Sequence, residues 1–409
     1  MHKKLIAAAV AGLLAAPVVA QAQSTVQIYG VAEWEYGYLD QGNGRPRVDY
    51  NEVTGSYLGF KGTESLGGGL SAWFQCETTM DLRAFDQVGL CSRNSALGFQ
   101  GGFGNVWGGR WHTPFSRMYG IGMVGIEETG NLGFARIHGS TGSTSLVEQG
   151  AGNAGNISRQ QFRRRESCLT TYETPNMGGF MVGFAISCGN AASDGAAGAG
   201  AATNAGANKK PRLWSTAATY NKGPLGLGIG YQKHTDVGAF NTIGAAELDD
   251  RAWGAAARYT VGPVLLGATY MDRKWETGVG AHTKNRTWTI GGAWTIAGPH
   301  QLHFAYGDTS DSKGNGGSMD TAATGGGIGG AEAPGADTGF KAFSLAYQYS
   351  FSKRTTAKIG WVRYDNDANS DAVRPYNVAA LRGVNGAAGG PGQLGQALDS
   401  WSLVLKHRF

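Results

Sequence analysis

The chain has 409 residues and a formal net charge of +5 at pH 7, a surplus too small to indicate a nucleic-acid-binding protein. Glycine accounts for 68 residues, more than twice its average usage of about 7%, whereas proline accounts for only 11. Because tryptophan and tyrosine are also plentiful, this composition excludes a collagen-like chain and a simply disordered one.

The first residues, MHKKLIAAAVAGLLAAPVVAQAQ, have the three parts of a secretory signal peptide. A short basic head precedes an apolar stretch, and an A-x-A cleavage site ends at Ala22. We therefore expect a signal peptide over residues 1–22 and a single mature domain over 23–409. A membrane anchor is the alternative, but the apolar stretch is short and is interrupted by Pro17.

Along most of the mature chain, apolar and polar residues alternate with a period of two, and amphipathic helical runs are scarce. The segments TVQIYGVAEWEYGYL, FMVGFAIS and KAFSLAYQYSF each have one apolar and one polar or small face, as half-apolar strands do. The C-terminal DSWSLVLKHRF follows the same rule to its last residue. Its two faces consist of Trp401, Leu403, Leu405 and Phe409, and of Ser402, Val404, Lys406 and Arg408.

The connections between these strands alternate in length. Seven are tight turns of hairpin chemistry, such as SLGGG, GGFG, PNMGG and SKRT, and we expect the other eight to be long polar loops. About sixteen strands of near ten residues with this asymmetry predict an all-β fold, a transmembrane 16-stranded antiparallel β-barrel. Its last strand must pair with its first, because hydrocarbon tolerates no open sheet edge. A soluble propeller or sandwich is the alternative, but the polar faces fit a wet lumen better.

Several stretches resemble the general porins of Gram-negative bacteria, especially their β-proteobacterial branch. They are VQIYGVAEW, SYLGFKGTESLGGGLSAWFQCE, RNSALGFQGGFGNVWGGRWHTP, TYETPNMGGF, YSFSKRT and KHRF, and they span the mature chain. The resemblance implies a homotrimer of barrels in the outer membrane, each narrowed by an inward-folded third loop. It also implies contact with outer-membrane lipid and lipopolysaccharide, and a terminal phenylalanine, Phe409, that acts as an assembly signal for the barrel assembly machinery.

In this branch, three arginines usually line the narrow zone of the pore. By motif position Arg93 and Arg165 match two of them, whereas Tyr57 stands at the third. The resemblance therefore implies a weaker anion preference than in relatives with all three. Lys61 and Arg110 match positions that are commonly basic.

These residue types suit a pore constriction, because fixed charge beside a narrow water column acts before solvent screens it. Arg163 adds a further guanidinium, and a solvated rim cluster is the alternative for each of these arginines. Arg93 poses a difficulty, since strict alternation places it on the face of Leu97 and Phe99, which should meet lipid. A bulge would be needed to turn it inward.

The longest stretch without strand character, residues 111–161, contains two adjacent acids, Glu127 and Glu128. If this segment folds into the barrel, the acids would face the arginines and create a transverse field. The alternative is an ordinary extracellular loop with two exposed carboxylates.

The four cysteines show no C-x-x-C spacing, so zinc and thioredoxin-type sites are poor interpretations. A secreted chain enters an oxidising compartment, where disulfides are expected. Cys76 and Cys91 flank one long loop, and Cys168 and Cys188 lie symmetrically about a tight turn. We therefore predict the disulfides Cys76–Cys91 and Cys168–Cys188 at the extracellular rim, each worth roughly 3 kcal/mol.

The sequence gives little indication of a catalytic site, because the chain lacks the G-x-S-x-G, H-E-x-x-H and P-loop motifs. We expect no catalytic residue, metal or cofactor, and no serine–histidine trio that a barrel lipase would need. The predicted function is an outer-membrane porin, a passive diffusion channel for small hydrophilic solutes and ions with a mild anion preference. A channel specific for a nutrient, a sugar or an organic anion, is the alternative.

Overall fold

The computed structural model describes residues 25–40, 42, 47–52, 55–80, 82, 89–125, 162–188, 212–235, 248–317, 333–370 and 394–409. The predicted signal peptide, residues 1–22, lies outside them. Within the described part of the chain, no helix is long and apolar enough to cross a membrane.

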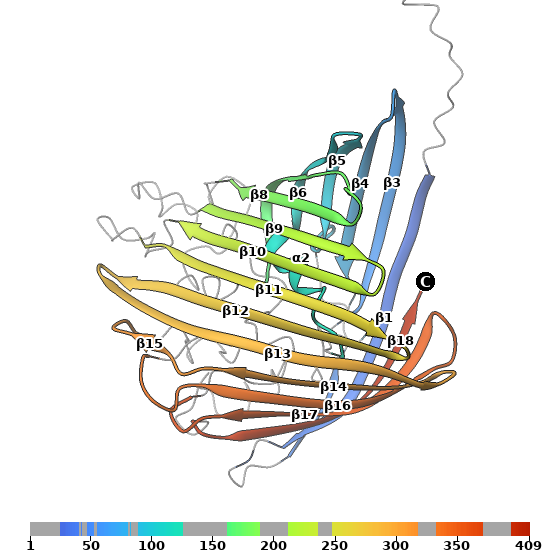
Figure 1. The fold of residues 1–409 in the computed structure, drawn as a ribbon. Helices are drawn as coiled ribbons and strands as arrows, with labels where there is room; N and C mark the ends of the chain where they lie inside the picture. Colours follow the sequence, from blue (N-terminus) through green and yellow to red (C-terminus); the bar gives the residue numbers. More distant parts are fainter. Residues whose placement is uncertain are drawn as a thin grey trace, which may run out of the picture.

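Sixteen of the described strands follow one another, antiparallel, around a single closed sheet (Figure 1). Two shorter strands, β2 (Val48–Glu52) and β15 (Lys313–Gly314), pair with β1 and β13. The prediction of a sixteen-stranded antiparallel barrel is therefore confirmed. Its strands are β1 (Thr25–Asp40), β3 (Tyr57–Gly67), β4 (Leu70–Thr79), β5 (Ser95–Gly101), β6 (Gly104–His112), β7 (Arg165–Glu173), β8 (Phe180–Ser187), β9 (Arg212–Lys222), β10 (Leu225–Thr235), β11 (Asp250–Val261), β12 (Val264–Gly278), β13 (Ala281–Ala297), β14 (His300–Thr309), β16 (Phe340–Ser350), β17 (Thr355–Asn366) and β18 (Ala397–Arg408).

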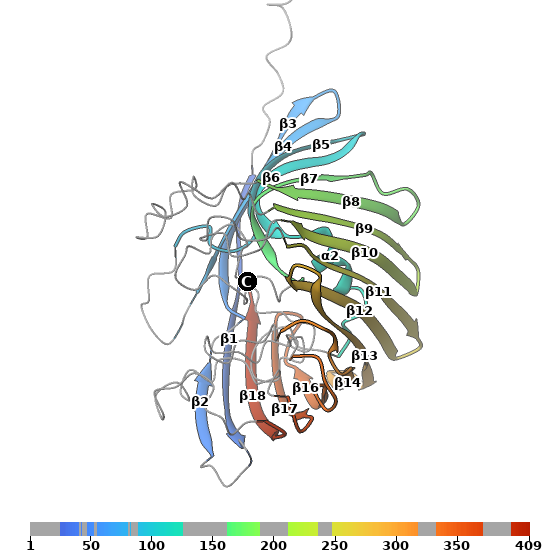
Figure 2. The ribbon, with the colours of Figure 1, turned by 90° about the vertical axis from the view of Figure 1, so that its left-hand side faces the viewer.

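The first and last strands close the barrel (Figure 2). β1 and β18 pair from Val31 opposite Arg408 to Asp40 opposite Asp399. The ladder then continues to the end of the chain. The Gly30 amide donates to the Phe409 carbonyl at 3.0 Å, and the Phe409 amide donates back at 3.1 Å. The terminal aromatic is thus part of the sheet.

Alternation along the strands separates an outer from an inner face. On β18, Trp401 and Leu403 are exposed, whereas the alternating Ser400 and Ser402 are buried. An apolar outer face and a polar inner face are the arrangement that a barrel needs in a membrane.

One connection differs from the sequence prediction. The seven predicted tight turns are present, but the link between β12 and β13 is also tight, with Gly280 at a φ of +71°. The expectation of eight long loops is therefore wrong by one. The polar residues of this segment belong to strands and not to a loop. The strands β12 and β13 are 15 and 17 residues long, and they pair with each other beyond the ends of their neighbours.

The strand beside β1 is interrupted between β2 and β3, where Ser56 replaces the missing backbone partners. Its buried hydroxyl accepts from the Glu33 amide at 2.8 Å and donates to the Glu33 carbonyl at 2.9 Å. The backbone of β1 is therefore satisfied across the interruption.

Candidate functional site: the lumen of the barrel

A short helix, α2 (Pro114–Tyr119), lies on the inner side of the barrel wall (Figure 2). Thr113 caps it by accepting from the Ser116 amide at 3.2 Å, and proline occupies its first turn, where an amide would have no helical partner. Phe115, Met118 and Tyr119 are buried against β9, β10 and β11. The helix thus has no apolar face left for solvent.

The wall accepts the helix because glycines occupy the inward positions that the helix approaches most closely. A Cβ at Gly228 would lie 2.5 Å from Cγ of Met118, and a Cβ at Gly254 would lie 1.6 Å from the hydroxyl of Tyr119. That hydroxyl donates to the carbonyl of Tyr270 at 2.8 Å. The glycines on β10 and β11 are therefore places where helix and wall approach too closely for any side chain.

The described residues that flank positions 126–161 lie inside the barrel. After α2 the chain follows the inner wall to Gly125, and at the far end Phe162 stacks on His234 with ring centres 4.6 Å apart. Residues 126–161, with Glu127 and Glu128, lie outside the described residues. The inward fold of the loop as a whole, and the acidic side of the constriction, stay predictions.

The structure brings three predicted pore residues to one inner wall. Tyr57 and Lys61 project inward from β3, and Nζ of Lys61 lies 4.8 Å from the ring centre of Tyr29. The guanidinium of Arg93 lies 5.0 Å from the ring centre of Tyr57. Arg93 therefore faces the lumen. The strand alternation that would place it on the lipid side does not include it, because β5 begins only at Ser95. Arg93 belongs to the turn before the strand, where alternation does not apply.

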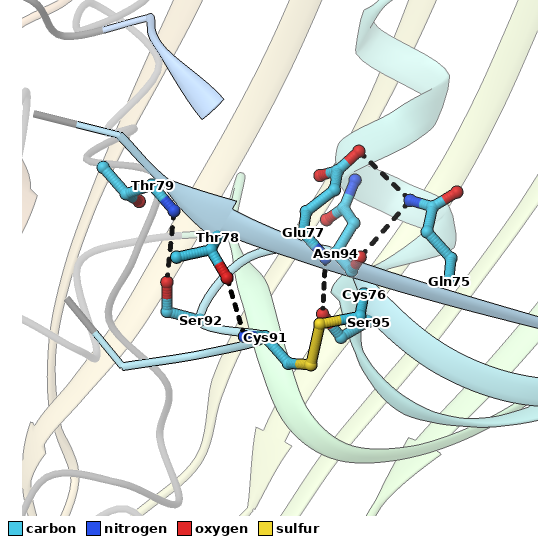
Figure 3. Close-up of a disulfide and its surroundings, with 9 residues drawn as sticks. All are labelled: Gln75, Cys76, Glu77, Thr78, Thr79, Cys91, Ser92, Asn94 and Ser95. Atoms are coloured by element: carbon cyan, nitrogen blue, oxygen red, sulfur yellow. Dashed lines mark hydrogen bonds between the residues drawn. A yellow bond between two sulfur atoms is a disulfide. The ribbon is translucent and has the colours of Figure 1, made fainter. Parts of the chain in front are cut away.

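An acid that the sequence analysis did not single out lies within this group. Glu77 accepts from the hydroxyl of Tyr29 at 3.0 Å. It also accepts from the side-chain amide of Gln75 at 3.1 Å (Figure 3). Its only sequence signal was its position on the polar face of β4. Because it sits beside Lys61 and Arg93, it offsets part of their positive charge.

Arg165 at the start of β7 and Arg163 just before it lie on the same side as Lys61 and Arg93, and we call these four residues the basic wall. Nε of Arg165 donates to Oδ1 of Asn94 at 2.8 Å, which ties β7 to the turn that carries Arg93. The ring of His112 lies in the field of four guanidinium groups. These belong to Arg93, Arg117, Arg163 and Arg165.

The other two arginines of this region are held in polar contacts. Arg164 pairs with Glu166 at 2.8 Å, and both side chains are fully buried. Arg110 stands opposite Ser95 and donates to the hydroxyl of Ser167 at 2.8 Å. Arg164 and Glu166 therefore contribute little net charge to the water column.

Both predicted disulfides are present. Cys76 is bonded to Cys91 across 15 residues of sequence (Figure 3). Cys168 is bonded to Cys188 across 20 residues. The first bond joins β4 to the turn that carries Arg93, and the second joins β7 to the end of β8. They therefore fasten the two segments that carry the basic wall.

A second basic group, missed from the sequence, lies on the inner face of β17 and β18. Lys358, Lys406 and Arg408 line a polar recess of about 240 Å³ together with His303. Lys406 pairs with Glu33 at 2.6 Å. The parity of the C-terminal strand had placed Lys406 and Arg408 on the lumen side, but nothing in the sequence connected them with Lys358.

Three tryptophans also face inward, on the side of the strands that otherwise carries polar or small residues. Trp73, Trp107 and Trp111 contact one another with ring centres 5.3 to 6.3 Å apart. Trp107 is buried, so the cluster is wall packing at least in part. No group of three potential metal ligands occurs among the described residues.

The comparisons with known proteins agree with this architecture. A family model described as Gram-negative porin matches residues 7–369. Outer membrane porin protein 32 of Delftia acidovorans is 29% identical over 315 residues, which cover 75% of this chain and 79% of that protein. An outer membrane porin protein of Bordetella pertussis is 29% identical over 276 residues, with shares of 61% and 63%.

Solved structures share the fold at low sequence identity. An anion-selective porin from Comamonas acidovorans has a TM-score of 0.67 and 20% identity, and the match covers 95% of this chain and 100% of that one. The trimer form of OmpT from Vibrio cholerae has a TM-score of 0.60 and 14% identity, with shares of 94% and 99%.

Proposed function

The chain belongs to the Gram-negative porin family, and on that premise we propose that its outer-membrane channel passes small hydrophilic solutes and ions with a mild preference for anions. Passage is passive, driven by the concentration gradient. The selectivity arises where fixed charges crowd the water column, because there the field acts on an ion before salt can screen it.

One observation carries the anion preference, the gathering of basic side chains on the inner wall. Arg93, Arg163 and Arg165 lie close enough to His112 to act on it electrostatically, Lys61 belongs to the same wall, and Glu77 is one acid within this group. The second basic group on β17 and β18 adds positive charge to another part of the same lumen. The preference is mild because Tyr57 occupies a position that is commonly arginine in relatives, and because acids of segment 126–161 face the basic wall in this proposal.

The test is the reversal potential across a planar bilayer in a salt gradient. We expect the unmodified channel to favour anions at low salt and to lose that preference as the screening length falls from about 30 Å at 0.01 M to about 3 Å at 1 M. Arg165→Ala should shift the potential toward cations. Arg363→Ala is the matched control, because Arg363 is paired with Asp399 on the outer face. A cation-selective unmodified channel would show that the charge assignment is wrong.

The same proposal includes a homotrimer and recognition of Phe409 by the barrel assembly machinery. A relative in fold was solved as a trimer form, and the pairing of Phe409 with Gly30 puts the terminal aromatic on the outer surface at the closing seam. A stable monomer in mild detergent would refute the trimer. Normal insertion of a chain without Phe409 would refute the assembly signal.

A further inference from the structure

Two disulfide cysteines have a backbone conformation that residues other than glycine rarely adopt. In the part of the chain that the structure describes, three such residues have a positive φ: Cys91 at 59°, Cys168 at 54° and Asp337 at 56°. This conformation costs free energy and persists where the surrounding structure enforces it, often beside a functional site. Cys91 opens the short turn that carries Arg93, and we call residues 91–94 the arginine turn.

The arginine turn is fastened to β4 beyond the end of the regular sheet. The ladder between β4 and β5 reaches only to Gln75. Past that residue, the Cys91 amide donates to the Thr78 hydroxyl at 2.9 Å (Figure 3). The Cys76–Cys91 disulfide adds a covalent link at the same place. The strained turn is therefore held by contacts with β4 that are not part of the regular ladder.

The arginine turn orders two guanidinium groups of the basic wall at once. Arg93 belongs to the turn, and its amide donates to the Glu77 carbonyl at 2.9 Å. Asn94 holds the second group, because its side-chain oxygen accepts from Nε of Arg165 at 2.8 Å. The backbone carbonyl of Asn94 also accepts from the side-chain amide of Gln75 at 3.3 Å (Figure 3). A movement of the arginine turn therefore displaces both arginines.

The disulfide itself lies on the far side of the barrel wall from the water column. Along β4, Gln75 and Glu77 belong to the inner face, whereas Cys76 shares the outer face with the exposed Phe74. A disulfide also carries no charge, so it exerts no Coulomb force of its own on a passing ion. Its influence on ion passage must therefore act through the residues that it positions.

The second disulfide offers an internal comparison, because the strand ladder supports the same junction. Cys168 and Cys188 lie directly beyond the pair of Leu169 and Ser187 at the end of the ladder between β7 and β8. The Cys188 amide donates to the Cys168 carbonyl at 3.0 Å. Loss of this disulfide leaves the two strands paired, whereas loss of the first disulfide removes a link that lies outside any ladder.

We propose that the Cys76–Cys91 disulfide and Asn94 set the ion preference of the channel by fixing the arginine turn. With the turn fixed, Arg93 and Arg165 keep their charge beside the water column. This inference rests on the proposed anion preference, and it identifies positioning groups that carry no charge themselves.

Loss of either positioning group should lower the anion preference, for an electrostatic reason. Glu77 lies on the strand to which the turn is fastened, and its carboxylate belongs to the same group of side chains. A guanidinium that leaves its present place is attracted to this carboxylate. The ion pair that forms presents little net charge to the water column, so fewer anions are drawn in.

The test is the reversal potential across a planar bilayer in a salt gradient at low salt, measured on the full-length mature protein. Asn94→Ala should shift the potential toward cations by an amount comparable to the shift for Arg165→Ala. The matched control is Asn105→Ala, because Asn105 also accepts a hydrogen bond on the inner wall, from Nε1 of Trp73 at 2.8 Å. The control should keep the potential of the unmodified channel.

The disulfide is tested in the same way. Cys76→Ser with Cys91→Ser should shift the potential toward cations, and Cys168→Ser with Cys188→Ser is the matched control. Both disulfides close loops of similar length, so both pairs of substitutions should lower the unfolding temperature by a similar amount. The shift of the reversal potential should be much smaller for the control pair, which separates positioning from stability.

A combined variant shows whether Asn94 acts through its partner. Asn94→Ala should add little further shift to a channel that already carries Arg165→Ala, because two changes to one interacting pair are not additive. A full additional shift would show that Asn94 influences ions by another route.

Three results would overturn the proposal. These are an unchanged reversal potential in Asn94→Ala and in the first pair of serine variants, equal shifts in the test and control variants, and full additivity with Arg165→Ala. Asn94→Ala keeps all four cysteines and carries the test if the serine variants do not assemble. An anion-selective unmodified channel with unaffected variants refutes the positioning role alone. A cation-selective unmodified channel refutes the proposed ion preference and this inference with it.

Discussion

Replacing Gly254 by alanine should loosen α2 from the barrel wall. The added Cβ would lie 1.6 Å from the Tyr119 hydroxyl and 2.5 Å from the Tyr270 carbonyl oxygen. Since carbon and oxygen atoms pack at about 3.5 Å, the tyrosine must retreat by about 2 Å. It would then lose its hydrogen bond to Tyr270 and part of its burial.

The size of the effect follows from those two losses. A hydrogen bond contributes about 0.5–1.5 kcal/mol and full burial of an aromatic side chain about 1.5–3 kcal/mol, of which about half is lost, so the helix should lose roughly 1–3 kcal/mol of docking free energy. Because Thr113 and Phe115 keep their bonds to Gln232 and Ser215, we expect displacement and not detachment.

Two measurements check this expectation on the same protein. Thermal unfolding should begin at a lower temperature, and single-channel recordings should show a changed conductance with more current noise. The matched control is Gly108→Ala, where an added Cβ meets nothing closer than 3.6 Å. The reasoning fails if Gly254→Ala behaves like the unmodified channel, or if Gly108→Ala has the same effect.

Three further predictions concern the seams of the barrel. Ser56→Ala should cost roughly 1–3 kcal/mol, because the Glu33 amide and carbonyl lose their buried partner, and an unchanged urea midpoint would contradict this. Cys76→Ser should lower the free energy of unfolding by about 3 kcal/mol, as expected for a loop of 15 residues, and reductant should then have a smaller remaining effect than on the unmodified chain. Gly30→Val should slow assembly about as much as deleting Phe409, since the new side chain would occupy the place of the Phe409 ring, 2.5 Å from an added Cβ; normal levels of assembled barrel would refute it.

The barrel was predictable because its two determinants are local. Alternation of period two is visible strand by strand, and the Gly and Pro turns mark one rim. The error at the link between β12 and β13 arose because polar residues such as Lys274, Lys284 and Arg286 continue the strands past the apolar zone. Alternation of apolar and polar residues identifies only the part of a strand that contacts lipid. It cannot identify the part of a hairpin that extends beyond the apolar zone of the membrane.

The candidate site was only partly predictable. Motif positions identified Lys61, Arg93 and Arg165, which the structure brings to one wall. Strict alternation misplaced Arg93, because the rule holds inside a strand and not in the turn before it. Lys358 and Glu77 were missed because their importance depends on neighbours from distant strands.

The closing seam between β1 and β18 has a consequence for how the protein folds. Every other neighbouring pair of long strands is adjacent in the sequence, but Val31 meets Arg408 across nearly the whole chain. Closing so long a loop is entropically costly and slow, and until it happens the sheet has two unpaired edges that can capture another chain. The first strand therefore keeps an open edge until β18 pairs with it. For this protein the most hazardous stage of folding is the interval before these two strands meet.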